Sequence, residues 1–287
     1  MIVSTPFYIR FSGITVKFTP HRPVLLPEEF TSLRCTDTQA ADASYEIRPL
    51  EVPLSPAEPV FYNNQGTRIY HTKEGWLRIY PMKASEDGCQ VACLFRPDGK
   101  HTLYFPAQLW QHYTRPMHCV PQLALELLLL KQNAFLLHSS VVEKHGKAIL
   151  FSGPSGAGKS TQAELWAKYL AADILNGDRC VIMEKPDGFY GGGSILAGSS
   201  GIYRPEQYPI AGIFLVKQAP RNSIRRLGAQ ALIPMLGQTI VNSWDPEFME
   251  KLTSLYQNLL SQVRVYELCC RPDAGAVQLV YQTLFQK

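Results

Sequence analysis

A glycine-rich segment in the second half of the chain limits the choice of fold more than any other feature. Residues 153–161 read GPSGAGKST, which fits the spacing Gly-x4-Gly-Lys-Ser. An apolar run at 148–151 precedes the segment, and a helix-forming pattern, STQAELWAKYL, follows it. A strand that turns through glycines into a helix aims its loop amides and the positive end of the helix dipole at one anion. The sequence therefore predicts an α/β domain with a phosphate-binding loop, or P-loop.

The side chains of this loop predict nucleotide and metal binding. Lys159 adds a point charge for the terminal phosphates of ATP or another nucleoside triphosphate. Ser160 offers its hydroxyl to Mg²⁺, and Thr161 caps or positions the same turn. The predicted cofactor-binding set is Gly153, Pro154, Ser155, Gly156, Ala157, Gly158, Lys159, Ser160 and Thr161.

A magnesium ion bound to phosphate also needs a carboxylate, usually at the end of a neighbouring strand. Asp178, in ILNGDR, is the first candidate, and Asp173 is the second. Asp173 falls at the start of the predicted strand, far from the carboxyl edge where open α/β sheets bind ligands. We therefore predict Ser160 and Asp178 as metal ligands, with a turn-forming role of Asp178 after Gly177 as the alternative.

The two apolar runs before and within the motif predict a hairpin. FLLHSSVV and KAILFSG are separated only by Glu-Lys-His-Gly. With the turn centred between Lys144 and His145, antiparallel pairing sets His138 opposite Phe151, beside the predicted phosphate site. His138 is then either a catalytic residue or a hydrogen-bonded core histidine.

Two later segments are further candidates. Residues 189–204, FYGGGSILAGSSGIYR, predict either a loop that closes over a ligand or a long hairpin with glycine bulges. In APRNSIRRL, Arg225 and Arg226 stand where guanidinium groups could neutralise a transferred phosphoryl group, unless they belong to a solvated basic turn. The predicted catalytic set is Lys159, Asp178, His138, Arg225 and Arg226.

The sequence predicts two domains. The first is α+β and rich in strands, and the second is α/β. Residues 1–115 hold short alternating runs between turn signals, with 31–60 as an irregular connection or edge. From 116 to 287, the helix-forming PQLALELLLLKQ leads into interleaved strands and helices. After the motif we expect a strand at 211–216, helices near 228–237 and 246–259, a strand at 263–268 and a final helix from about 273.

Composition excludes several classes of protein. The 287 residues are 46% hydrophobic, which fits a soluble globular protein. A net charge of +4 is too small to indicate electrostatic binding to a nucleic-acid backbone. An odd number of cysteines favours reduced thiols, and the spacing of Cys89, Cys93, His118 and Cys119 fits no zinc module. Without a signal-peptide pattern or an apolar run long enough for a bilayer, we expect a cytoplasmic protein with no membrane or nucleic-acid partner.

The segment LLHSSVVEKHGKAILFSGPSGAGKST, followed by ILNGDR, resembles the nucleotide-binding core shared by HPr serine kinases and ATP-dependent phosphoenolpyruvate carboxykinases. The full sequence is similar to HPr-kinase-related proteins that accompany peptide-modification genes in bacteria. The resemblance implies a P-loop domain of this type, a histidine on the strand before the loop, and an Asp-Asp pair after it. Gly177 stands at the first acidic position of that pair. By analogy the resemblance also implies self-association.

Together these features predict a Mg²⁺-dependent kinase that moves the γ-phosphoryl group of ATP to a hydroxyl of a peptide, a protein or a small molecule. The loss of one acid at Gly177 favours an alternative, a nucleotide-responsive peptide-binding module with little or no transfer. A third candidate is carboxykinase-like transfer to a small carboxylate-containing metabolite.

Overall fold

The computed structural model is a strand-rich α/β structure with two major sheets. It describes residues 2–26, 31–36, 41–52, 54, 56, 58–62, 66–81, 90–107, 110, 120–196 and 198–286. The chain divides into two compact units: unit 1 is Met1–Arg10 with Ile14–Leu128, and unit 2 is Phe11–Gly13 with Leu129–Lys287. The domain boundary predicted between residues 115 and 116 lies outside the described residues, as do Cys89, His118 and Cys119.

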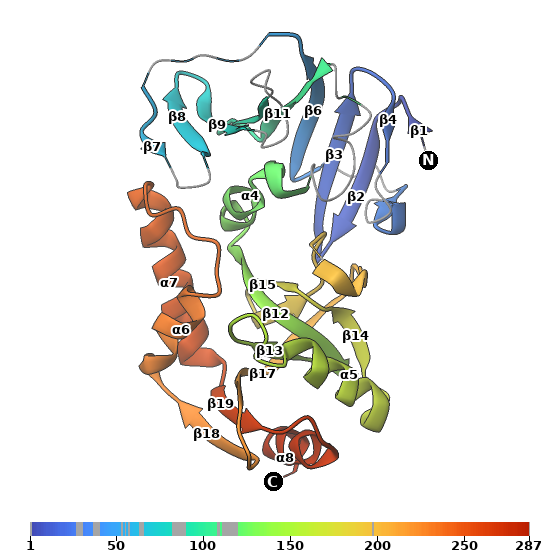
Figure 1. Ribbon diagram of the computed structural model, residues 1–287, viewed down its shortest axis with the longest axis vertical. Helices are drawn as coiled ribbons and strands as arrows, with labels where there is room; N and C mark the ends of the chain where they lie inside the picture. Colours follow the sequence, from blue (N-terminus) through green and yellow to red (C-terminus); the bar gives the residue numbers. More distant parts are fainter. Residues whose placement is uncertain are drawn as a thin grey trace. The chain divides into compact units, whose positions relative to one another are not determined.

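Unit 1 is built on one sheet, which appears in blue to green in Figure 1. Its described strands are, in sheet order, β5 (Arg34–Cys35), β2 (Phe7–Phe11), β3 (Ile14–Pro20), β6 (Ala43–Leu50), β11 (Lys100–Pro106), β10 (Gln90–Phe95), β9 (Gly75–Pro81), β8 (Arg68–Thr72) and β7 (Phe61–Tyr62). A separate pair joins β1 (Ile2–Val3) and β4 (Val24–Leu25). The β-rich character predicted for this part of the chain is confirmed.

Strand β6 corrects the prediction that 31–60 is an irregular connection or edge. It lies between β3 and β11 and runs parallel to both. Tyr45 and Ile47 are buried on one face, which is the alternation of a half-buried strand. Pro49 made the segment look irregular. It is accommodated because the pairing with β3 ends at Ile47, so that Pro49 has only one neighbouring strand.

The predicted helix at 121–132 is shorter in the structure. A 3-10 turn, η2 (Val120–Leu123), is followed by α4 (Leu125–Lys131), and Ala124 between them has a left-handed φ of 50°. Glu126 of α4 forms a buried ion pair with Arg78 of β9, and each side chain is less than 10% exposed. This pair fastens α4 to the sheet of unit 1.

Removal of that ion pair should destabilise unit 1 strongly. In Glu126→Ala, the Arg78 guanidinium stays buried without its carboxylate, and breaking a buried pair costs about 3–5 kcal/mol. Urea unfolding followed by tryptophan fluorescence measures the change. The matched control is Glu51→Ala, which removes the exposed pair with Arg22 and should cost less than about 1 kcal/mol. Equal losses in the two variants would contradict this account.

Unit 2 is built on a second sheet, whose first five strands pair in a closed circuit because β13 also pairs with β17. The strands are, in sheet order, β13 (Lys147–Ser152), β12 (Ala134–Lys144), β15 (Arg179–Lys185), β16 (Gly188–Gly192), β17 (Gln207–Gln218), β19 (Val265–Cys270) and β18 (Ser223–Leu227), with β14 (Asp173–Asn176) beside β12. Parallel pairs β13–β17 and β17–β19 bring the carboxyl ends of three strands to one edge.

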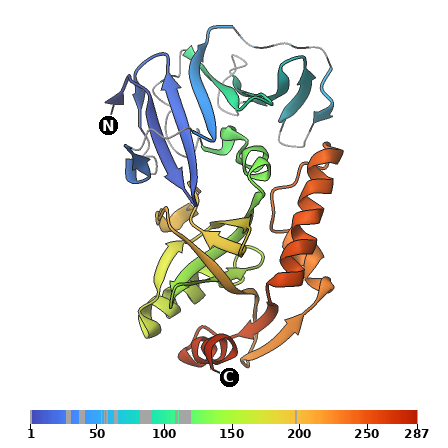
Figure 2. The same cartoon turned by 180° about the vertical axis from the view of Figure 1, so that it is seen from behind.

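Helices cover this sheet. They are α5 (Lys159–Leu170), η3 (Gly198–Ser200), η4 (Ala229–Ala231), α6 (Leu232–Leu236), α7 (Pro246–Gln262) and α8 (Ala274–Phe285). Figures 1 and 2 show these helices as ribbons, and α5 and α8 pack on each other. Trp166 and Val280 belong to the buried cluster around Phe151 and Phe214. Helix α7 packs elsewhere, with the Tyr256 ring against Phe135 of β12.

The later elements follow the sequence prediction closely. The strand expected at 211–216 extends over β17, and the helix expected at 228–237 is split into η4 and α6. Asp273 caps α8 by accepting the Ala276 amide hydrogen.

Among the described residues, no helix is both long and apolar enough to cross a membrane. The five cysteines in these residues, Cys35, Cys93, Cys180, Cys269 and Cys270, are free thiols.

Candidate functional site

The hairpin that leads into the P-loop forms as predicted, but its register differs. Strands β12 and β13 pair through Lys144 and Lys147, so the turn is His145-Gly146, with φ of 54° and 70°. Positive φ at both central residues is the geometry of a two-residue hairpin turn. Phe151 therefore lies opposite Ser140, not His138. The same register carries His138 two residues further, level with Gly153.

The P-loop joins β13 to α5 at the carboxyl edge of the sheet. Gly153 opens the loop with a φ of 144°, and a Cβ there would lie 3.0 Å from the Val216 carbonyl oxygen of β17. Only glycine fits this close approach. Helix α5 has no acidic residue in its first turn and, in the described part of the chain, no side-chain cap. Its first amides and its dipole are therefore available to an anion, with no acidic side chain in the first turn to compete.

Lys159 is folded back onto this loop. Its Nζ donates to the carbonyl oxygens of Gly153 and Pro154, each at 3.0 Å, and the residue is buried. Burial lowers the pKa of the Lys159 ammonium, and the charge of Asp178 acts in the opposite direction. The ammonium therefore lies at the loop, within electrostatic reach of Asp178.

Two serines fix the start of α5. Ser160 lies in the first turn, and its hydroxyl is 3.4 Å from the Gly177 carbonyl oxygen, next to Asp178. The predicted metal ligands Ser160 and Asp178 thus lie on adjoining segments. Ser140 of β12 is buried and donates its hydroxyl to the Lys159 carbonyl oxygen at 2.7 Å. Sequence analysis missed Ser140, although it stands two residues from His138 on the same strand.

Asp178 follows β14 in a turn made by Asn176. The Asn176 side-chain oxygen accepts the amide hydrogens of Asp178 and Arg179, each at 2.9 Å. The side chain of Asp178 is partly exposed, and its Oδ1 lies 3.3 Å from His138 Nε2. The predicted turn-forming role thus belongs mainly to Asn176, while the Asp178 carboxylate pairs with His138 and Arg179.

The surroundings of Asp178 favour its ionised form. The hydrogen bond from His138 is the largest influence that lowers the pKa of the carboxyl, and the charges of Arg179, His138 and Lys159 lower it further against the effect of burial. Asp173, the weaker candidate, lies at the start of β14 and pairs with Arg204 at 3.3 Å. Of the two candidate carboxylates, Asp178 is therefore the one that pairs with His138 and lies next to the segment that contacts Ser160.

The glycine-rich segment 189–204 reaches Asp178. Strand β16 ends at Gly192, and the chain returns to β17 through a connection in which residue 197 is not described. Gly198 has a φ of 57°, and a Cβ there would lie 2.8 Å from the Asp178 Cβ. The Asn176 amide also donates to the Ser194 carbonyl oxygen at 3.1 Å. The segment is thus a hairpin connection that packs on the predicted metal ligand.

This close packing gives a direct test of the segment. Gly198→Ala forces either the connection or Asp178 to move, so we expect it to lower any metal-dependent activity by about tenfold or more while the fold remains. Gly201→Ala is the matched control, because Gly201 has a similar φ of 61° but no heavy atom within 4 Å of an added Cβ. Circular dichroism and initial rates compare the two variants. A larger loss in Gly201→Ala would refute the contact's role.

Arg225 and Arg226 are not brought to the P-loop. Both lie on edge strand β18, where Arg225 pairs with Glu267 of β19 at 3.0 Å. Ser152, Leu215, Glu267 and Arg225 occupy one row across β13, β17, β19 and β18. Three strand spacings of about 4.8 Å then separate Arg225 from the strand before the loop. The catalytic role of Arg225 and Arg226 stays a prediction. The alternative, a solvated basic turn, is wrong because both residues lie on a strand.

A hollow of about 490 Å³ adjoins the loop on the side of β17 and β19. Gly158 and Thr161 form one wall, and Gln218 and Arg271 lie at the ends of the two strands. The Gln218 amide donates to the Gly156 carbonyl oxygen at 2.7 Å, which ties the loop to β17. Such a volume is typical of small-molecule sites. Thr161 therefore lines a ligand-sized space next to the phosphate loop.

Comparison with known proteins shows a distant structural likeness. No family model and no curated protein matches the sequence. Among solved structures, the HPr(Ser) kinase/phosphatase from Coxiella burnetii is similar at 10% sequence identity over 52% of this chain and 92% of that chain, with a TM-score of 0.28.

Proposed function

We propose that unit 2 is a Mg²⁺-dependent phosphotransferase that binds ATP or another nucleoside triphosphate and moves its γ-phosphoryl group to a hydroxyl. The main support is that separate parts of the chain converge at one sheet edge. The P-loop and Lys159 follow β13, Ser160 lies against the Gly177 carbonyl, and Asp178 is held by His138. Such a set positions phosphates and neutralises their charge, which is most of what phosphoryl transfer requires.

The residues present fit the nucleotide and the metal. The loop amides and the uncapped start of α5 would bind the phosphates, and Lys159 would exchange the carbonyls of Gly153 and Pro154 for phosphate oxygens. The Ser160 hydroxyl and the Asp178 carboxylate are the hard oxygen ligands that Mg²⁺ prefers. When bound, the ion would neutralise negative charge on the phosphates. The hollow beside Thr161 would accommodate the nucleoside.

His138 and Asp178 would handle the proton of the acceptor. The acceptor oxygen bonds to the γ-phosphorus while the bond from phosphorus to the bridging oxygen breaks, which leaves a nucleoside diphosphate. The hydroxyl proton passes to the Asp178–His138 pair, whose two groups lie 3.3 Å apart. Gly177 supplies no second carboxylate, so this pair takes over the role of a second acid.

A transfer assay tests the proposal. The protein is incubated with γ-labelled ATP, Mg²⁺ and acceptors that carry hydroxyls: free serine, serine peptides and small alcohols. Label in an acceptor supports the kinase. Saturable ATP binding without any transfer supports the second function, a nucleotide-responsive peptide-binding module, which the glycine at 177 favours. Absence of both binding and transfer at millimolar ATP overturns the assignment.

His138 should set the acid limb of the pH–rate profile. Because its hydrogen bond lowers the pKa of Asp178, the active carboxylate persists to lower pH in the native protein. In His138→Ala that pKa rises, so activity should be lost at a higher pH as the solution is acidified. His138→Gln keeps an N–H donor and should restore most of the profile. Identical acid limbs in all three proteins would contradict the effect of the His138 hydrogen bond on the Asp178 carboxylate.

A further inference from the structure

Unit 1 carries a polar hollow on one face of its sheet. The hollow measures about 450 Å³ and lies over β3, β6 and β11, three neighbouring strands that run parallel. The opposite face of these strands is buried, through Phe18, Tyr45 and Leu103. Parallel strands usually have apolar residues on both faces, so a polar face on such strands is unusual. The volume falls within the range of small-molecule sites.

Strand register places two lysines on either side of one serine. Lys17 of β3 and Lys100 of β11 are both paired with Ser44 of β6. Neighbouring strands are about 4.8 Å apart, so the two lysine Cα atoms are about 10 Å apart with Ser44 midway. All three residues line the hollow. Long lysine side chains at this spacing can bring both ammonium groups to one ligand above the serine hydroxyl.

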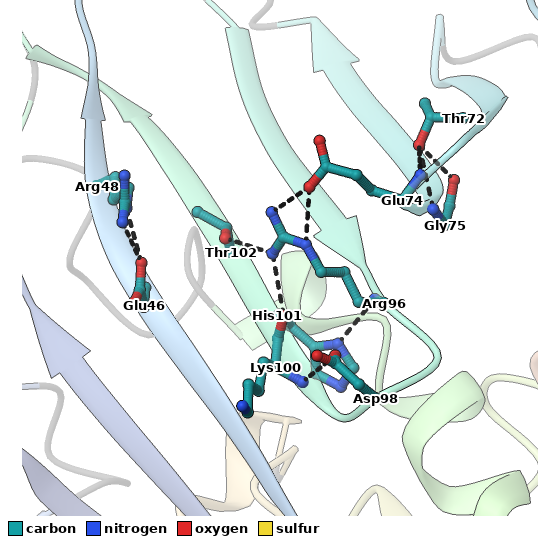
Figure 3. A network of polar contacts seen from close by, with 10 residues as sticks. All are labelled: Glu46, Arg48, Thr72, Glu74, Gly75, Arg96, Asp98, Lys100, His101 and Thr102. Atoms are coloured by element: carbon teal, nitrogen blue, oxygen red, sulfur yellow. Dashed lines mark hydrogen bonds and ion pairs between the residues drawn. The ribbon is translucent and has the colours of Figure 1, made fainter.

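The charges of these lysines are not neutralised within the described residues. Arg48 pairs with Glu46, and Arg96 pairs with Glu74 at 2.8 Å (Figure 3). In contrast, neither Lys17 nor Lys100 has an ion pair in the part of the chain that the structure describes, although the Lys17 Nζ lies 5.9 Å from the centre of the Tyr8 ring. Two ammonium groups of the hollow are therefore without a carboxylate partner among the described residues, while its guanidinium groups are paired with carboxylates.

The wall beside Lys100 is held in place by a hydrogen-bond network. Figure 3 shows the Arg96 guanidinium donating to the Thr102 hydroxyl and to the Lys100 carbonyl oxygen, at 2.8 and 3.0 Å. The Asp98 carboxylate accepts the Lys100 amide hydrogen at 2.9 Å, and His101 Nδ1 accepts that of Arg96 at 3.0 Å. A wall fixed in this way loses little conformational freedom when a ligand binds.

We propose that this hollow binds a small ligand that carries a phosphate group, with the ammonium groups of Lys17 and Lys100 on two sides of the phosphate and the Ser44 hydroxyl donating to it. A phosphate monoester bears close to two negative charges at neutral pH, which matches two ammonium groups that have no ion pair among the described residues. Lysine binds phosphate as a point charge, and the arginines that line the hollow are already paired with carboxylates. The site is separate from the P-loop and does not depend on the function of unit 2.

Calorimetric titration with inorganic phosphate tests the site. All proteins carry Lys159→Ala, to weaken binding at the P-loop, and ionic strength is held constant. Lys17→Gln and Lys100→Gln should each weaken phosphate binding by about tenfold, the usual effect of losing one charge-assisted contact. Lys73→Gln removes an exposed lysine from the turn between β8 and β9, outside the hollow, and should leave the affinity unchanged.

Two further arms make the result decisive. Ser44→Asp places a carboxylate between the ammonium groups and should abolish phosphate binding while the fold, checked by circular dichroism, is kept. Succinate, a dicarboxylate of similar charge, should bind at least tenfold more weakly than phosphate. The proposal is overturned if the Lys17→Gln/Lys100→Gln protein binds phosphate as well as its parent, or if succinate binds as tightly. Absence of any saturable heat at millimolar phosphate overturns it as well.

Discussion

Lys159→Ala is expected to lower the rate of phosphoryl transfer by about a thousandfold or more, because under the proposed function it removes the ammonium group that would neutralise charge on the terminal phosphates. In the structure the Lys159 ammonium spans the carbonyl oxygens of Gly153 and Pro154, so it is held within the loop before any nucleotide arrives. Its burial would strengthen its interaction with a phosphate, since little water competes there. Initial rates with γ-labelled ATP measure the loss.

The controls separate charge from structure. Lys159→Met keeps most of the side-chain volume and should lose transfer to the same extent as the alanine variant. Lys168→Ala makes the same chemical change in the last turn of the same helix, where the lysine is exposed, and should leave the rate unchanged. Turnover that survives in both Lys159 variants would be incompatible with the proposed function.

The local geometry of the site could largely be predicted from sequence. The P-loop motif fixes a strand, a glycine turn and a helix, and these appear as β13, the loop and α5. The hairpin was also predictable, but its centre was placed one residue too early. A two-residue turn needs positive φ at both central positions, which His145 and Gly146 supply. A shift of one residue in the turn moves every cross-strand partner by two, which is why Phe151 faces Ser140.

Contacts between distant segments could not be predicted in this way. Nothing in the segment 189–204 indicates that Gly198 packs on Asp178, because that contact depends on how the connection from β16 to β17 folds back over the turn after β14. The buried ion pair of Glu126 and Arg78 could not be predicted either, since a glutamate or an arginine taken alone is expected at the surface. In each case a long-range contact overrides the usual preference of the residue type.

Asp178→Asn should reduce transfer by at least about a hundredfold, because the amide keeps the size of the side chain but loses the charge needed for metal binding and for proton transfer. The depressed pKa of Asp178 means that the carboxylate is ionised at neutral pH in the native protein, so the neutral amide removes a charge that is present there. The rate measured against Mg²⁺ concentration should also shift to higher metal requirement.

Asp173→Asn provides the matched control for this prediction. It makes the same substitution at the start of β14, where the carboxylate pairs with the exposed Arg204. That variant should keep the native rate and the native Mg²⁺ dependence. Equal behaviour of the two asparagine variants would mean that the carboxylate beside His138 has no part in the reaction, and that the proton acceptor and the metal ligand lie elsewhere in the chain.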